Sequence, residues 1–195
     1  MIKYLVVAFI ALLVGGCAHM DLSNGIPLVW KPTTIVARTD TIDLTGRENA
    51  RLRVEVTDNR SDSGLIGRNT EKLPPRNVTT PDNVAAFVNE HLSQLISGTG
   101  LIEVDSNGTS ILKAEILQFF VQESEIYNGE VRLKVTLIDR GGNPVWTGIT
   151  SGASTRFGRS YSAENYYETL SDSLIEAVHH LMQNASFRSA LAGVS

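Results

Sequence analysis

Alternating apolar and polar residues predict two strands most clearly. Within residues 51–57, Leu52, Val54 and Val56 share one face of an extended chain, and charged residues share the other. Residues 131–137 repeat this pattern, with arginine, lysine and threonine between the apolar positions. Both segments therefore predict strands that are buried on one side and exposed on the other.

Shorter segments rich in β-branched and other apolar residues predict further strands. They are residues 33–38, 101–104, 111–122 and 145–155. A turn at 106–108 is expected to join 101–104 to 111–122 as a hairpin. The Gly141–Pro144 turn is expected to connect the next two strands, so an antiparallel meander is predicted.

Apolar residues at helical spacing predict a first helix after residue 79. Thr80 is expected to be its N-cap, with Pro81 at the first helical position, and Gly98 or Gly100 is expected to end it. Its core stripe consists of Val84, Phe87, Val88, Leu92, Leu95 and Ile96.

A second helix is predicted from about Ser162. Phe187 and Leu191 predict one more short helical segment close to the end of the chain. The stripe of the second helix consists of Tyr167, Leu170, Leu174, Val178 and Leu181.

This order of elements favours an α+β fold: a two-layer domain in which two main helices pack on one face of a mostly antiparallel sheet. The opposite face would present charged residues to water or to a partner. These residues are Arg53, Glu55, Arg132 and Lys134.

The start of the chain resembles a bacterial lipoprotein signal peptide. Lys3 precedes an apolar stretch at residues 5–14, which is too short to span a bilayer, and two glycines then lead to Cys17. We expect residues 1–16 to be removed and Cys17 to be lipidated. By resemblance to the bacterial sorting rule, Ala18 favours the outer membrane, so we expect a lipid anchor at its periplasmic face.

The remaining chain is expected to form one periplasmic domain. Residues 17–32 hold the lipidated cysteine and a proline-punctuated tether, and residues 33–195 hold the domain. The apolar stretch at 26–30 is expected to dock on the domain, although contact with the lipid surface is an alternative. Cys17 is the only cysteine, so its lipidation would leave no thiol for a disulfide, a zinc site or catalysis.

Several stretches resemble the YajG-type family of bacterial outer-membrane lipoproteins. They are residues 14–17, residues 54–60 leading to 65–67, and the first helix from Val84 to Gly100. The resemblance implies the location and the kind of fold described above. It implies no defined molecular activity.

The long loop from Asp58 to Thr79 is the strongest candidate for a partner-binding site. A calcium loop is excluded because Arg60, Ser63 and Asn69 stand where ligands or a glycine are needed. A structural alternative is an Asx turn in which Arg60 pairs with a neighbouring carboxylate. The candidate partner-binding residues are Asp58, Asn59, Arg60, Leu65, Ile66 and Arg68.

Other chemistry finds little support in the sequence. No nucleotide-binding, hydrolase or metal-binding motif occurs, and we predict no catalytic residue, no metal site and no cofactor. His179 and His180 diverge by about 100° on a helix, so they are not expected to chelate one metal. With 17 basic residues against 21 acidic ones, the chain is also not expected to bind nucleic acid.

We therefore expect a non-enzymatic binding or accessory module of the cell envelope that binds an envelope protein. The alternative is a lipid-binding auxiliary component of an envelope lipid-transport system, with lipid held in a groove between helices and sheet. A hydrolase is a weaker third hypothesis, since no residue can be named for it.

Overall fold

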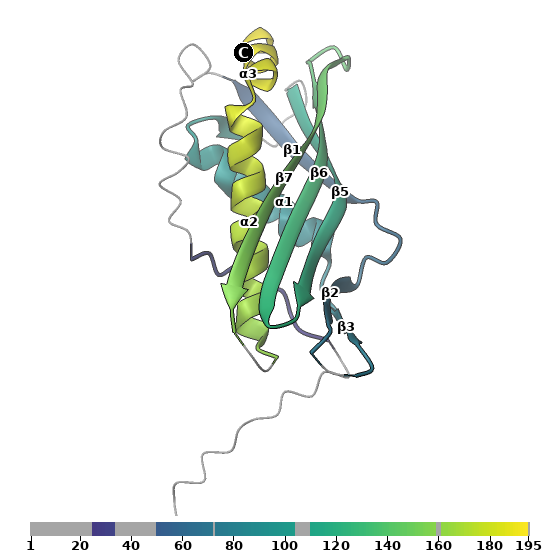
Figure 1. The fold of residues 1–195 in the computed structure, drawn as a ribbon. Helices are drawn as coiled ribbons and strands as arrows, with labels where there is room; N and C mark the ends of the chain where they lie inside the picture. Colours follow the sequence, from purple (N-terminus) through teal and green to yellow (C-terminus); the bar gives the residue numbers. More distant parts are fainter. Residues whose placement is uncertain (1–24, 34–49, 72, 104–109, 159–160, 195) are drawn as a thin grey trace, which may run out of the picture.

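The computed structural model describes residues 25–33, 50–71, 73–103, 110–158 and 161–194. Residues 1–24, which include Cys17, lie outside the described residues, and so does the strand expected at 33–38 except for Thr33. In the part described, the fold is α+β, as the sequence predicts (Figure 1). The strands are β1 (Arg51–Asp58), β2 (Leu65–Asn69), β3 (Arg76–Thr79), β4 (Ile102–Glu103), β5 (Ser110–Glu123), β6 (Ile126–Ile138) and β7 (Pro144–Phe157). The helices are α1 (Val84–Gly98), α2 (Ala163–Gln183) and α3 (Ala185–Gly193).

Strand β5 is the centre of the sheet. One of its edges pairs with β6, and β6 pairs with β7, so these three strands form the predicted antiparallel meander. The other edge is shared, because β1 pairs in parallel with the first half of β5 and β2 pairs in parallel with its end. Most of the pairing is antiparallel, in agreement with the sequence-based prediction.

The prediction of a hairpin between residues 101–104 and 111–122 is wrong. Strand β4 pairs in parallel with β1, with Arg51 opposite Ile102, and β1 separates β4 from β5. Turn-forming residues between two apolar segments are compatible with a hairpin, but they do not decide which strand becomes the neighbour.

The segment expected to be one long loop contains a hairpin. Strands β2 and β3 pair antiparallel, with Asn69 opposite Arg76, and extend the sheet beside β5. Both strands are short, and β3 is mostly polar, so the sequence of this segment resembles that of a loop.

Helix α1 begins later than the sequence suggests. Asn83 is its N-cap, and the side chain of Asn83 accepts a hydrogen bond from the Ala86 amide at 3.0 Å. Thr80 instead accepts a bond from the Asp82 amide through its hydroxyl, at 3.2 Å. The other predicted boundaries are confirmed: α1 ends at Gly98, and Ser162 is the N-cap of α2.

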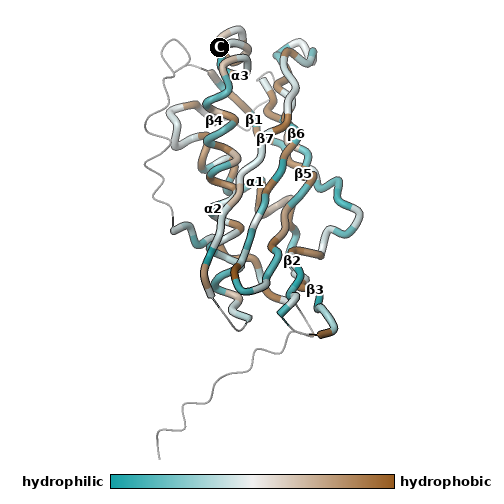
Figure 2. Tube along the Cα trace, viewed as in Figure 1, coloured by the Kyte–Doolittle hydropathy of each residue, from teal (hydrophilic) through white to brown (hydrophobic). Residues whose placement is uncertain are grey.

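The helices cover one face of the sheet, and the core lies between the two layers. Helix α2 packs along β7 and β6, and α1 packs against β1 (Figure 1). The contact between α2 and β7 is close at Gly152, where an added Cβ would lie 2.2 Å from the Ala177 nitrogen. Nearby, the Thr150 hydroxyl donates to the Ala177 carbonyl at 2.6 Å. Figure 2 shows apolar and polar positions alternating along the strands, as expected for a sheet with one covered face.

Among the described residues, no helix combines the length and apolar character needed to cross a membrane.

Candidate functional site

An N-terminal segment, residues 25–33, lies across the helical layer and is fastened at both helices. The amide of Ile26 donates to the Thr79 carbonyl at 2.8 Å, and Ile26 is fully buried. The Leu28 amide then donates to the Asp82 carboxylate at 2.6 Å. The first half of the segment is therefore bound to the connection between β3 and α1.

An aromatic contact continues this attachment along α1. The indole of Trp30 stacks on the imidazole of His91, with ring centroids 4.2 Å apart and planes inclined by 10°. Phe87 meets the same imidazole edge-on at 4.5 Å. His91 thus lies between two aromatic rings.

The end of the N-terminal segment is bound to α2. The Lys31 amide donates to the Ser171 hydroxyl at 2.9 Å, and the Thr33 amide donates to the Asp172 carboxylate at 2.8 Å. Arg156 of β7 also pairs with Asp172, whose side chain is almost fully buried. The Lys31 ammonium lies 3.2 Å from Glu168. The apolar stretch expected to dock does so, and charged residues fix its far end.

The turn after β1 is organised by Arg60. Its guanidinium forms two hydrogen bonds with the Asp58 carboxylate, at 2.9 and 2.7 Å. Its other donors reach three backbone carbonyls, those of Ser63, Leu65 and Phe119, at 2.6 to 3.1 Å. A guanidinium has five N–H donors, and all five are used within the chain.

The remaining candidate loop residues occupy different environments. Asn59 donates to Glu115 of β5 at 2.8 Å, Ile66 is fully buried, and Leu65 is half-buried. Arg68 is exposed and lies opposite Gln122 of β5, on the sheet face that the helices leave open. The six residues thus divide between a structural turn, the core and the open face.

A buried carboxylate that sequence analysis does not single out lies at the end of β5. Glu123 is fully buried and accepts hydrogen bonds from Tyr127 at 2.9 Å and from Tyr166 at 2.7 Å. The Tyr127 hydroxyl also accepts the Ser162 amide at 3.0 Å, next to the start of α2. The cluster ties the end of β5 to β6 and α2.

Burial sets the acidity of these tyrosines. The pKa of Tyr127 is raised to about 12, and burial is the main cause. The neighbouring Glu123 raises this pKa further. Burial likewise raises the pKa of Tyr166 and Tyr161, and the Glu123 carboxylate raises both further. A group enclosed in this way is out of reach of a substrate, so the cluster is best explained as a polar tie within the core.

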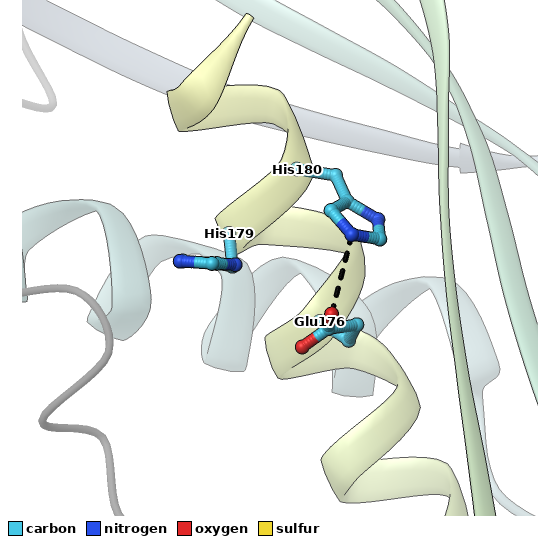
Figure 3. A group of neighbouring side chains, drawn as sticks. All are labelled: Glu176, His179 and His180. Carbon is cyan, nitrogen blue, oxygen red and sulfur yellow. Dashed lines mark ion pairs between the residues drawn. The ribbon is translucent and has the colours of Figure 1, made fainter.

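Near the end of α2, Glu176, His179 and His180 each bring one potential ligand atom within 4.8 Å of the others (Figure 3). Divergence by about 100° therefore does not keep the ligand atoms of the two histidines apart. Nevertheless, Figure 3 shows the two imidazoles on different sides of the helix. His180 faces Glu176 at 3.2 Å, and its other nitrogen lies 2.7 Å from the Ser151 carbonyl. The absence of a metal site stays a prediction.

The open sheet face carries paired charges with apolar residues among them. Lys134 of β6 lies 3.1 Å from Glu115 of β5, and its neighbour in register on β7 is Ile149, which is 59% exposed. Arg132 is also exposed, in the row of Gln118 and Ser151. This face therefore mixes charged, polar and apolar side chains.

No family model matches the sequence, and no curated protein matches it. Among solved structures, the fold is similar to that of a Xanthomonas campestris protein of the family called DUF330. That protein is 12% identical, with a TM-score of 0.48, over 74% of this chain and 85% of the other.

Two further similar structures carry the name lipoprotein. A minor lipoprotein from Acinetobacter baumannii is 14% identical, with a TM-score of 0.33, over 72% of this chain and 91% of the other. Lipoprotein GNA1162 from Neisseria meningitidis is also 14% identical, with a TM-score of 0.33, over 58% of this chain and 88% of the other. These likenesses concern the fold only, and membership of the YajG-type family stays a prediction.

Proposed function

We propose that this chain is a lipoprotein anchored through Cys17 at the periplasmic face of the outer membrane, and that its domain is a non-enzymatic module that binds an envelope protein. The observation that carries the proposal is the attachment of residues 25–33 to both helices. The described chain begins at Gly25, and eight residue steps separate Gly25 from Cys17. Such a short connection suits a module that works close to its anchor.

The proposed binding surface is the open sheet face, extended by Arg68 at its β2 edge. Arg60, Asp58 and Ile66 are engaged within the fold, as described above, and offer no free group to a partner. Three exposed residues lie instead on one face of the sheet: Arg68 on β2, Arg132 on β6 and Ile149 on β7. Arginine is enriched in protein interfaces, and a central apolar residue can be buried there.

In-cell crosslinking of the full-length lipoprotein tests this surface. A photoreactive residue at position 68, 132 or 149 is expected to capture the same envelope protein. Glu90 and Ala86 provide matched control positions, because both are exposed on α1 in the helical layer. Equal capture at the α1 positions, or no protein captured at the open face, would contradict the proposal.

The anchor is tested separately by Cys17→Ser. We expect this variant to keep its signal peptide and to lose the acyl chains, because lipidation and cleavage both depend on the cysteine. Membrane fractionation and the mass of the purified protein provide the readouts. Normal processing of the variant would contradict the anchor.

The alternative function requires a lipid groove between helices and sheet. At the α2–β7 contact there is no such space, since an added methyl group at Gly152 would already overlap the helix backbone. The close contact favours a filled core on this side of the domain and therefore favours the protein-binding proposal.

A further inference from the structure

We infer that one end of the sheet rests on the lipid bilayer, with Leu73, Ile126 and Phe157 in contact with the membrane surface. This inference rests on the lipid anchor proposed above. It adds an orientation of the domain and a second surface with a different partner.

The three residues are exposed and apolar. Leu73 is 91% exposed and Phe157 is 83% exposed. Neither side chain therefore contributes much to the core of the domain. Ile126 is 37% exposed and is the register partner of Phe157 across β6 and β7. Single exposed apolar residues are common, but here they gather where several strands end.

Strand register places all three residues at one end of the sheet. Strands β5 and β7 end here and β6 begins here, at the lower end in Figure 1. Asn69, the last residue of β2, is level with Glu123, the last residue of β5, so the β2–β3 connection that contains Leu73 projects beyond the same end. Neighbouring strands lie about 4.8 Å apart, so β2 to β7 spans only about 15 Å.

The length of chain before Gly25 brings this end to the membrane. Eight residue steps from Cys17 reach at most about 29 Å. Gly25 lies against Thr79, because an added Cβ would be 2.6 Å from the Thr79 carbonyl oxygen. Thr79 is the last residue of β3, and the tip of the β2–β3 hairpin is only about 13 Å further along the strand.

The opposite end of the sheet is too distant to share this contact. Val145, near the start of β7, is separated from Phe157 by twelve residue steps, or about 40 Å of strand. Val145 is also 43% exposed and apolar, so it differs from Phe157 chiefly in its place along the strand. It is therefore a matched control.

The test uses the full-length lipoprotein, purified after lipidation in cells. Cys17 is the only cysteine, and acylation blocks its thiol, so Leu73→Cys, Phe157→Cys or Val145→Cys gives one reactive thiol for an environment-sensitive fluorophore. Each labelled protein is reconstituted in vesicles of phosphatidylethanolamine and phosphatidylglycerol that contain a nitroxide-labelled lipid. Circular dichroism confirms that each variant is folded.

We expect the labels at positions 73 and 157 to shift to shorter emission wavelength and to be quenched several-fold by the nitroxide lipid. The label at position 145 should keep the longer emission wavelength of a water-exposed fluorophore. The nitroxide lipid should quench it little. Equal quenching at all three positions, or stronger quenching at 145, would overturn the orientation.

The mass of the same preparation separates the two proposals. If the mass shows an acylated Cys17 but the labels do not differ, only the orientation fails. If the mass shows no acyl chain, the anchor fails and the orientation fails with it.

Discussion

Arg60 and Asp58, two residues apart at the end of β1, hold each other through two parallel hydrogen bonds. Each side chain is only 9% exposed. The same guanidinium also lies over the Phe119 ring, 5.9 Å from its centroid. The residue pair that a sequence pattern suggests for partner binding therefore closes the chain onto its own central strand.

Replacing Arg60 should destabilise the domain. Arg60→Ala leaves the Asp58 carboxylate and three carbonyls without their donor, and removing one partner of a buried pair typically costs about 3 to 5 kcal/mol. Arg60→Lys should restore only part of this, since an ammonium has three donors and no fork geometry. Urea unfolding of the full chain in detergent provides the measurement.

Arg68→Ala is the matched control for Arg60. The Arg68 side chain is exposed on the neighbouring strand, so its loss should change the free energy of unfolding by less than about 0.5 kcal/mol. An Arg60→Ala variant as stable as Arg68→Ala would contradict the structural role of the turn.

The hydroxyls of Tyr166 and Tyr161 should differ in their contributions to stability. Tyr166→Phe removes a donor from the buried Glu123 carboxylate and should cost about 1 to 3 kcal/mol. The Tyr161 hydroxyl is buried and has no hydrogen-bond partner among the described residues. Tyr161→Phe should therefore be neutral or slightly stabilising, and thermal unfolding of the two variants provides the comparison.

The same cluster predicts sensitivity to alkali. The pKa of Tyr127 is about 12 in the folded chain, against 10.0 for an unperturbed tyrosine. Because the folded pKa is the higher one, the unfolded chain loses its proton first as the pH rises. The stabilisation is complete below pH 10 and is lost as the pH rises towards about 12.

Melting temperatures measured across this alkaline range test the effect. Tyr127→Phe should flatten the fall in melting temperature, although it lowers stability at neutral pH by removing the bonds to Glu123 and Ser162. An unchanged slope in this variant would show that Tyr127 does not contribute to it.

The close contact between α2 and β7 should not tolerate a methyl group. In Gly152→Ala, the new Cβ would overlap backbone atoms of Ser173 and Ala177, and neither can move without shifting the helix. We expect a loss of about 3 kcal/mol or more. Gly98→Ala is the control, because nothing lies within 4 Å of its added Cβ, and alanine favours a helix.

Attachment of the N-terminal segment should depend on Trp30 much more than on its neighbour. Trp30→Ala removes the stacking contact with His91, whereas Val29→Ala removes a side chain that is already 42% exposed. Amide hydrogen exchange should therefore accelerate at Ile26 and Leu28 in the first variant and change little in the second. Equal exchange in both variants would indicate that the backbone bonds alone hold the segment.

The spacing of apolar residues predicts where the strands and helices lie better than it predicts which strands pair with each other. The long strands and both main helices follow from the apolar spacing, because each has a regular buried face. The parallel pairing of β4 with β1 could not be predicted, since it depends on the helical crossover through α1. The hairpin of β2 and β3 could not be predicted either, because both strands are short and β3 is mostly polar.

The polar core residues were missed for a related reason. Glu123 follows Phe119 and Val121 at intervals of two, so alternation places it on the buried face of β5. That signal was available, but a charged residue at the end of a strand is more often exposed. Asp172 of α2 is likewise buried, and one group that it binds, the backbone amide of Thr33, lies far away in the sequence.

The attachment of residues 25–33 also determines how the domain would bear mechanical load. A pull on an anchored Cys17 would first reach β3, through the bond from Ile26 to Thr79, and then Asp82 beside α1. Only after these contacts gave way would the force act on α2, through Ser171 and Asp172. The fastenings are thus arranged in series, so tension on the anchor would load the β3 edge of the sheet before it reached either main helix.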